Sequence, residues 1–364
     1  MLFEPFSSRT LALRNRLVMS PMTRSRAVDS NTPNALMAGY YAQRATAGLI
    51  VTEGTSPSPN GLGYARIPGL FNDAQARGWK AVTDAVHAKG GKIFAQLMHT
   101  GRVTGVANLP AGAEVVGPMA EAMPGEIYTD AGGMQPHGIP RAMSERDIAR
   151  AAGEYAQAAR LAIHAGFDGI ELHAANGYLI EQFLNANVNK RTDGYGGSIA
   201  NRNRFALEVA HAVVEAIGAD RVGLRLSPFG AFNSTGTYPE QGEQYLALAR
   251  DLSAMGLLYL HVLDHSAMGA PAVPEEYKLR LRQAFKGVFI LAGGFDRDKA
   301  EKALAENRAD LIAFGKPFLA NPDLVERLKQ RAPLNAPDFS TFYTPGAKGY
   351  TDYATLDQLE ALTQ

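Results

Sequence analysis

Cysteine is absent from the 364-residue sequence, and its absence removes several kinds of chemistry at once. The chain can form no disulfide, use no thiolate nucleophile and hold no iron–sulfur cluster through cysteine ligands. No apolar run approaches the ~20 residues that a membrane-spanning helix needs. The first residues, Met-Leu-Phe-Glu-Pro-Phe, lack the basic region and apolar stretch of a secretory signal. We therefore expect a cytoplasmic protein with no membrane partner.

An excess of charge of either sign is also absent. Lys+Arg and Asp+Glu both number 36, so the formal net charge is +0. Such a balance provides no general field that would attract nucleic acid or an anionic membrane surface. Any phosphate site must then be local, built from particular loops. Hydrophobic residues make up 46% of the chain, which is enough for a large core.

A short apolar run followed by an amphipathic helical stretch recurs along the chain. The runs are Arg16–Met19, Leu49–Thr52, Lys92–Leu97, Gly169–Leu172, Val222–Leu226, Leu257–Val262, Val288–Ala292 and Leu311–Phe314. Each is bounded by Gly, Pro or charged residues, as buried parallel strands are. Eight alternating units predict an α/β fold of the (β/α)8 or TIM-barrel type, a single domain over residues 1–364.

Helical periodicity predicts the intervening helices. The predicted helices are Asp73–Lys89 with Asp73 as a possible N-cap, a long stretch from the cap Ser144 to Ala165, Asn203–Ile217, Glu243–Met255, Asp298–Glu306 and Pro322–Arg331. The longest interruption is residues 108–141, rich in Gly, Pro and Met. We expect an excursion at the barrel mouth there, where a small hairpin would fit.

Three hydrogen-bond donors follow the fourth predicted strand, in the segment Glu171-Leu-His-Ala-Ala-Asn-Gly-Tyr178. His173, Asn176 and Tyr178 offer an imidazole, an amide and a phenol without any strong nucleophile. Such a set suits an oxygen that gains negative charge, and Tyr178 could act as a general acid. The structural alternative is three polar residues that satisfy one another in a loop. Three donors beyond one barrel strand favour the functional reading.

Other strand ends carry weaker signals. Thr23 and Gln96 could bond the edge of a heterocycle, although each could equally be structural. Arg225 lies in an apolar run, where its charge needs an anion. Its partner is either a buried carboxylate such as Glu171 or an anionic cofactor or substrate, and the local sequence leaves both open.

Glycines follow the seventh and eighth predicted strands, at Gly293, Gly294 and Gly315, with Lys316 beside the last. Barrels usually hold phosphate at this pair of loops. Since no dinucleotide-type glycine loop occurs elsewhere, a mononucleotide phosphate fits better than a dinucleotide.

Together these segments resemble the old yellow enzyme family of FMN-dependent reductases over nearly the whole chain. The most specific pieces are Ala165-Gly-Phe-Asp-Gly-Ile-Glu-Leu-His-Ala-Ala-Asn-Gly-Tyr-Leu179 and Arg191-Thr-Asp-Gly-Tyr-Gly-Gly-Ser198. The resemblance implies that His173 and Asn176 bind the carbonyl, nitro or phenolate oxygen of a substrate and that Tyr178 supplies a proton. The residues implied to bind FMN are Pro21, Met22, Thr23, Gly54, Gln96, Arg225, Gly293, Gly294, Gly315 and Lys316. The residues implied to line the substrate pocket are His173, Asn176, Tyr178, Tyr64, Met98 and Tyr343.

The reaction that the resemblance implies is reduction of the activated C=C bond of an α,β-unsaturated carbonyl or nitro compound, with NADPH or NADH as reductant. Hydride would come from flavin N5, and nitrate esters, nitro compounds and phenolic ligands are further implied partners. Two positions depart from the commonest family pattern. Lys316 stands where Arg is frequent, and Met98 stands where a bulky aromatic is frequent.

Two other readings are available. A relative with an iron–sulfur cluster is disfavoured by the lack of cysteine. A flavin-binding or redox-sensing protein without turnover is disfavoured by Tyr178 beside both oxygen-binding donors. The oligomeric state, monomer or homodimer, is left open by the sequence.

Overall fold

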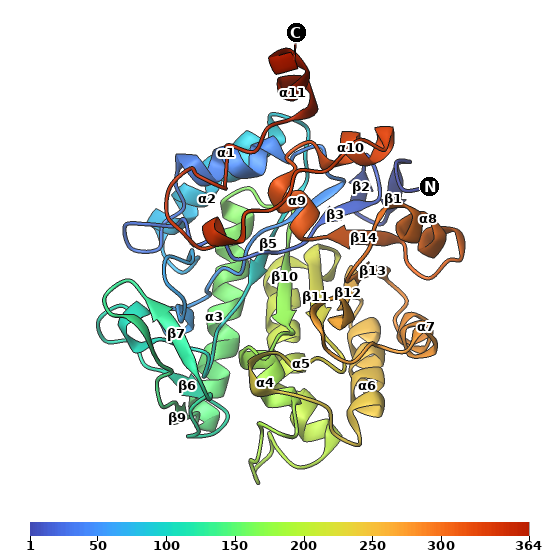
Figure 1. Cartoon of the computed structure of the whole chain (residues 1–364). Coiled ribbons are helices and arrows are strands. Elements are labelled where there is room, and N and C mark those ends of the chain that lie inside the picture. The colour runs from blue at the N-terminus through green and yellow to red at the C-terminus, as the bar shows by residue number, and fades with distance from the viewer. Residues whose placement is uncertain (364) are drawn as a thin grey trace.

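Eight parallel strands from all parts of the chain close into a barrel (Figure 1). The computed structural model describes residues 1–363, so the last residue of the predicted range 1–364 lies outside the described residues. The barrel strands, in order around the barrel, are β3 (Leu17–Met19), β4 (Leu49–Val51), β5 (Ile93–Leu97), β10 (Gly169–Ala174), β11 (Val222–Leu226), β12 (Tyr259–Leu263), β13 (Val288–Ala292) and β14 (Leu311–Phe314). The predicted TIM barrel and all eight of its strands are confirmed.

Helices surround the barrel in Figure 1 because most of them connect one strand to the next parallel strand, while the last three follow β14. They are α1 (Ala35–Gln43), α2 (Asp73–His87), α3 (Glu145–His164), α4 (Leu179–Leu184), α5 (Ile199–Ile217), α6 (Gln241–Ala254), α7 (Glu275–Ala284), α8 (Arg297–Ala305), α9 (Lys316–Ala320), α10 (Leu324–Gln330) and α11 (Leu356–Thr363). Short 3-10 helices lie at Pro59–Gly61, Val106–Asn108, Ala219–Arg221, Phe232–Ser234, Ser266–Met268 and Phe339–Thr341.

Helix starts follow capping chemistry, and the predicted N-cap of α2 and the predicted start of α5 are wrong. The N-cap of α2 is Asn72, whose side chain accepts from the amide of Gln75, so Asp73 is the first helical residue. Helix α5 begins at Ile199 behind the cap Ser198, four residues before the predicted start. The cap at Ser144 is confirmed, and it forms a capping box with Asp147.

Among the helices of the described residues, five escaped prediction: α1, α4, α7, α9 and α11. Helix α7 buries only Tyr277 and Leu281, too narrow an apolar stripe to show a helical period. Helices α4 and α9 have six and five residues, too few for periodicity to be read.

Three two-stranded sheets lie outside the barrel. The hairpin β1 (Phe6–Ser8) and β2 (Leu11–Leu13) packs Leu11 and Leu13 into the same apolar cluster as barrel residues. The segment 108–141 contains β6 (Val116–Gly117), which pairs with β9 (Arg141–Ala142), and the antiparallel hairpin β7 (Glu126–Thr129) with β8 (Gly133–Pro136). Figure 1 shows β7 standing beside the barrel rather than within it.

The inside of the barrel changes character along its axis. Toward the amino ends of the strands it is apolar, with Phe94 and Tyr259 among its residues. Because side chains alternate along a strand, the next inward positions are Gln96 and His261, nearer the carboxyl ends. Both are buried, as is Arg225 on the strand between β10 and β12. The carboxyl end of the barrel is therefore a buried polar layer, and the functional site is to be sought there.

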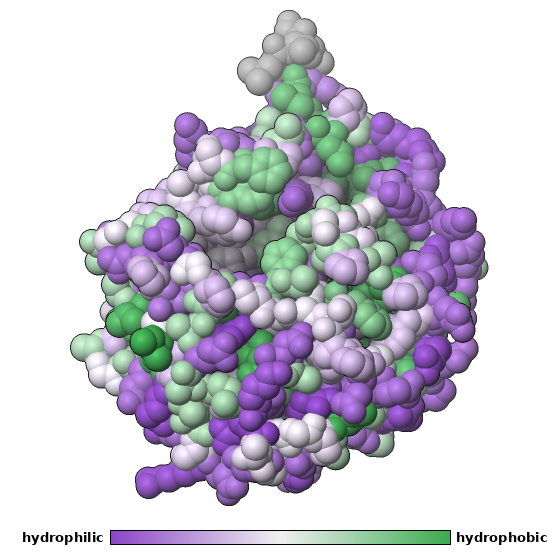
Figure 2. Space-filling model, turned by 60° about the horizontal axis from the view of Figure 1, so that its bottom comes forward, coloured by the Kyte–Doolittle hydropathy of each residue, from purple (hydrophilic) through white to green (hydrophobic). Residues whose placement is uncertain are grey.

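The outer surface visible in Figure 2 is mostly hydrophilic or intermediate, with hydrophobic side chains in small scattered groups. Among the described residues no helix is long and apolar enough to cross a membrane.

Candidate active site

The end of β10 and the tight turn after it present the three predicted donors, with His173 in the strand and Asn176 and Tyr178 beyond it. Asn176 and Gly177 both have positive φ, 61° and 75°, a conformation that Asn and Gly adopt more readily than other residues. A Cβ on Gly177 would lie 2.8 Å from the carbonyl oxygen of Phe232, so only glycine fits against the next loop. Helix α4 holds the turn from below, since Glu181 accepts from the Gly177 amide at 2.6 Å and Gln182 donates to the Gly177 carbonyl at 2.8 Å.

The hydrogen bonds of His173 determine which of its ring nitrogens carries the proton. The Ala175 amide donates to Nδ1 at 3.3 Å, so the proton of the neutral ring is on Nε2. Nε2 lies 3.5 Å from Nδ2 of Asn176. Two N–H donors at this separation can both donate to one acceptor oxygen placed between them, as an oxyanion site requires.

Electrostatics keep that imidazole neutral. His173 is 3% exposed, and burial together with the positive charge of Arg225 holds its pKa well below the ordinary value. The neutral ring can donate a hydrogen bond from Nε2 without carrying the positive charge of an imidazolium. The pair His173–Asn176 is therefore a neutral oxygen-binding site at physiological pH.

Tyr178 stands beside this pair. Its ring lies edge-on to the His173 ring, with centroids 4.9 Å apart, and its hydroxyl lies 3.1 Å from the Tyr64 hydroxyl. Burial raises the pKa of Tyr178 above its ordinary value of 10.0, so the phenol carries its proton at neutral pH. A phenol next to an oxygen-binding pair can donate a proton to a bound substrate.

Arg225 lies opposite His173 in the register of β10 and β11 and is 5% exposed. Its buried Nε has no hydrogen-bond partner, and no described carboxylate forms an ion pair with it. The candidate partner Glu171 instead accepts from Gln96 Nε2 at 2.8 Å, from the Tyr259 hydroxyl at 3.0 Å and from His261 at 2.9 Å. Of the two partners that the sequence left open, the carboxylate is engaged elsewhere, and the guanidinium is left for an anionic or electron-rich ligand.

The predicted cofactor residues share one end of the barrel. Gln96, His173 and Arg225 are each the last residue but one of neighbouring strands, and Gly54 follows β4. Pro21, Met22 and Thr23 follow β3, and Met22 approaches Gly315, since a Cβ on that glycine would lie 3.8 Å from the Met22 sulfur.

The two glycine loops are also neighbours, because β13 pairs with β14. Gly293 has φ 121°, and a Cβ there would lie 2.2 Å from the carbonyl oxygen of Asp264, so glycine is required. Lys316 is exposed, and its Nζ lies 5.3 Å from the centroid of the Phe339 ring. Backbone amides of two adjacent glycine loops with a lysine beside them suit a phosphate group.

A cavity of about 610 Å³ opens among the segments that follow β3, β4 and β10, the hairpin β7–β8 and residues 339–345. Predicted residues Thr23, Tyr64, Tyr178 and Tyr343 line it, with Tyr343 61% exposed at its rim. Met98 does not line it. Met98 is 1% exposed and packs in a cluster with Tyr64 and Tyr178, filling the space above Gly54, where a Cβ would lie 2.5 Å from the Met98 sulfur. Met98 therefore shapes the pocket from behind its lining.

Several lining residues were not predicted. They are Ser25, Ala65, Arg66, Glu126, Ile127, Tyr128, Met134, Phe339, Ser340, Thr344 and Pro345. Arg66 joins most of these segments, since it donates to the Ser25 carbonyl at 3.0 Å and the Tyr343 carbonyl at 2.7 Å and pairs with Asp130 on the hairpin β7–β8. The usable signal in the sequence was the length of the excursion, which indicated a wall at the mouth but not its residues.

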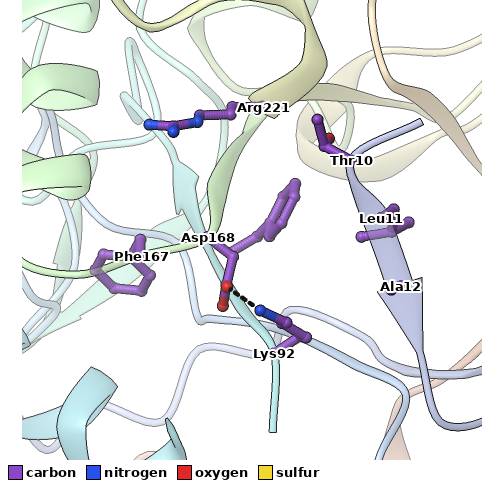
Figure 3. Close-up of a pocket in the computed structure, with 8 residues that line it drawn as sticks. Thr10, Leu11, Ala12, Lys92, Phe167, Asp168 and Arg221 are labelled. Atoms are coloured by element: carbon purple, nitrogen blue, oxygen red, sulfur yellow. Dashed lines mark hydrogen bonds and ion pairs between the residues drawn. The ribbon is translucent and has the colours of Figure 1, made fainter. Parts of the chain in front are cut away.

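A second, smaller cavity of about 290 Å³ lies at the amino ends of the strands, beside the β1–β2 hairpin (Figure 3). Its carboxylate is paired, since Asp168 accepts from Lys92 at 2.8 Å and lies 2.9 Å from the His87 ring nitrogen. The other charged residue of its lining, Arg221, is exposed to solvent. Among residues 1–363 no group of His, Asp or Glu side chains has the arrangement of a metal site.

Comparison with known proteins gives consistent matches. Residues 1–335 match the NADH:flavin oxidoreductase / NADH oxidase family. A probable flavin mononucleotide-dependent alkene reductase of Leishmania infantum is 43% identical, over 94% of this chain and 93% of its own. The solved structure of morphinone reductase has a TM-score of 0.93 at 46% identity and covers 98% of this chain and 96% of its own. The same reductase has also been solved in complex with tetrahydroNAD. An old yellow enzyme homologue from Zymomonas mobilis has a TM-score of 0.92 at 39% identity, with 98% of this chain and 99% of its own covered.

Proposed function

The chain belongs to the NADH:flavin oxidoreductase / NADH oxidase family, and from this premise we propose that His173, Asn176 and Tyr178 are its catalytic residues in the FMN-dependent reduction of activated alkenes. The reductant is NADPH or NADH. The substrates are α,β-unsaturated carbonyl or nitro compounds, with nitrate esters and nitro compounds as further candidates.

The observation that carries this proposal is the buried, unpartnered guanidinium of Arg225 next to the neutral donor pair. A buried guanidinium whose Nε has no hydrogen-bond partner and which forms no direct ion pair is unfavourable, so the site fits a group with electron-rich ring atoms, as the isoalloxazine of FMN has. Gln96 adds a free amide oxygen, since its nitrogen is used by Glu171. The glycine loops at 293–294 and 315 with Lys316 would hold the phosphate, and Pro21, Met22, Thr23 and Gly54 would contact the ring.

When bound, FMN would supply the redox chemistry, which is transfer of a hydride from NAD(P)H to the β-carbon of the substrate. The protein does the rest. His173 Nε2 and Asn176 Nδ2 hold the carbonyl or nitro oxygen and draw charge toward it, which makes the β-carbon electrophilic. Tyr178 gives its hydroxyl proton to the α-carbon, so one hydride and one proton saturate the C=C bond.

The cavity wall selects the substrate. The ring faces of Tyr64 and Tyr178 and the apolar Ile127 and Met134 favour flat, unsaturated molecules. Phenols fit the same place, because a phenolate oxygen can accept from both His173 and Asn176.

A flavin-binding or sensing role without turnover is the alternative. The two readings differ in one measurement, which is anaerobic mixing of the FMN-loaded, reduced protein with cyclohexenone, a nitroalkene or a nitrate ester. We expect the flavin absorbance to return at a rate that depends on substrate concentration, with the saturated product formed in equal amount. A protein that retains FMN but returns no oxidised flavin with any of the three would overturn the catalytic proposal, and one that cannot bind FMN would overturn the whole assignment.

We further propose a cytoplasmic location and a monomeric or homodimeric state. The balanced charge and the mostly hydrophilic surface support both. Light scattering of the purified protein distinguishes monomer from dimer.

A further inference from the structure

The polar layer beneath the catalytic donors contains one carboxylate that the proposed reaction does not use. Glu171 is fully buried inside the barrel, two residues before His173 on β10. An isolated carboxylate at such a place would be costly, so a structural barrel core would have an apolar side chain there. The cost of burying Glu171 therefore indicates that this carboxylate has a function.

The hydrogen bonds at Glu171 come from inward-facing groups on two other barrel strands, Gln96 on β5 and both Tyr259 and His261 on β12. Oε1 accepts from Gln96 Nε2, and Oε2 accepts from the Tyr259 hydroxyl and from His261 Nδ1. Since the His261 proton is on Nδ1, its Nε2 is an acceptor, and this buried atom has no partner in the described residues. Burial lowers the pKa of His261, which keeps the ring neutral. Burial opposes the charge on Glu171, but its contacts with His261, Arg225 and Gln96 outweigh burial and lower its pKa. The network thus holds one negative charge.

The bond to Gln96 fixes the orientation of that amide. With Nε2 committed to Glu171, only the amide oxygen of Gln96 is free, and no described group donates to it. Gln96 is therefore a fixed acceptor, suited to a ring N–H. Arg225, on the neighbouring strand β11, is the fixed donor. One ligand can therefore donate a hydrogen bond to Gln96 and accept one from Arg225.

We propose that Glu171 is a positioning residue for the flavin, which orients Gln96 as an acceptor and places a negative charge close to Arg225. This inference rests on the proposed function. The negative charge offsets part of the Arg225 charge, so the site stabilises reduced FMN, which is the more negative form, less than Arg225 alone would. Glu171 thereby keeps the bound flavin a stronger reductant.

Two substitutions separate orientation from charge. Glu171→Gln keeps the length of the side chain and an oxygen for Gln96 but removes the charge. Charges in a barrel interior interact more strongly than at a surface, so we expect the affinity for reduced FMN relative to oxidised FMN to rise at least tenfold. A tenfold change corresponds to about 30 mV in a two-electron potential. Glu171→Asp keeps the charge but is one methylene too short for Gln96, so both redox states should bind about twofold to tenfold more weakly at an unchanged ratio.

The experiment uses the full chain stripped of flavin and titrated with FMN, followed by anaerobic titration of the midpoint potential against a reference dye. The matched control is Glu215→Gln on α5, a carboxylate that is 70% exposed, where the same chemical change should leave the potential and the affinity as in the wild type. Lower thermal stability of Glu171→Gln at an unchanged affinity ratio would show a merely structural role and overturn the charge assignment.

Should Glu171→Gln fail to fold, Glu171→Asp decides alone. An unchanged FMN affinity, or a shifted potential in that charge-preserving variant, contradicts the inference. Wild-type protein that does not bind FMN would instead contradict the proposed function itself, so the two failures are distinguishable.

Discussion

Replacing Tyr178 with phenylalanine tests the assignment of the proton donor with little disturbance of its surroundings. The ring packs against His173 and Tyr64, with centroids 4.9 and 6.1 Å away, and belongs to the cluster that contains Leu62 and Met98. Phenylalanine preserves these contacts. The substitution removes the hydrogen bond with the Tyr64 hydroxyl at 3.1 Å, so we expect a stability loss of about 1 kcal/mol.

The effect on the reaction rate should be far larger and should be confined to one half-reaction, the oxidation of reduced flavin by the enone. General acid catalysis contributes ~100- to 10,000-fold, which corresponds to about 3–5 kcal/mol of barrier. We expect Tyr178→Phe to slow the return of oxidised flavin with an enone by this factor. Reduction of the flavin by NAD(P)H takes no proton from Tyr178 and should change by less than about threefold.

The pH dependence gives a second readout. Burial raises the pKa of Tyr178 above 10.0, so the hydroxyl stays protonated and the wild-type rate of enone reduction should be flat from about pH 6 to about pH 9. In the variant the proton comes from solvent, and the rate should fall as the pH rises.

Anaerobic stopped-flow of the two half-reactions measures both rates, with Tyr64→Phe as the matched control. Tyr64 lies beside the donor without being the donor, so its loss should cost less than about tenfold. Equal slowing of both half-reactions by Tyr178→Phe, or a slowing of enone reduction below about threefold, would refute the reasoning.

Three further perturbations have definite outcomes. Arg225→Met should weaken FMN binding at least about a hundredfold. The melting temperature of the flavin-free protein should stay close to wild type, because no described hydrogen bond is lost. A large drop in melting temperature would instead indicate a structural role. Asp130→Asn should release Arg66 from the hairpin, giving faster amide hydrogen exchange over residues 127–134 and a higher KM for bulky enones; unchanged exchange would show that the ion pair does not hold the wall. Burial raises the pKa of Glu181 to about 7, so the folded protein holds a proton that the unfolded chain releases, and this group destabilises the fold as the pH rises from about 4.5 to about 7. Urea unfolding should therefore show Glu181→Gln gaining up to ~3 kcal/mol relative to wild type between about pH 5 and about pH 8, and a constant difference would contradict the assigned pKa.

The predicted strands and helices could be read from the sequence because each depends on local periodicity and capping. The turn at Asn176–Gly177 is a good example, since two left-handed residues in succession need those residue types wherever the chain goes. Short or weakly amphipathic helices such as α7 could not be read, because only tertiary packing buries their two apolar side chains.

The partner of Arg225 could not be predicted from the sequence. The sequence offered Glu171 or a ligand, and both fit an arginine in an apolar run. Strand register decided between them, because it places Arg225 beside His173, and Glu171 bonds to Gln96, Tyr259 and His261 instead.

By itself the sequence determined the alternation of strands and helices that predicts the barrel, the three donors at and beyond the end of β10 and the glycine loops after β13 and β14, since each follows from short local patterns. Only the tertiary structure decided the tautomer of His173, the lack of a hydrogen-bond partner at Arg225 Nε and the cavity wall whose segments Arg66 connects. Those features depend on atoms from strands and loops far apart in the chain. Their relative positions follow from closure of the barrel and from packing, which no local pattern encodes.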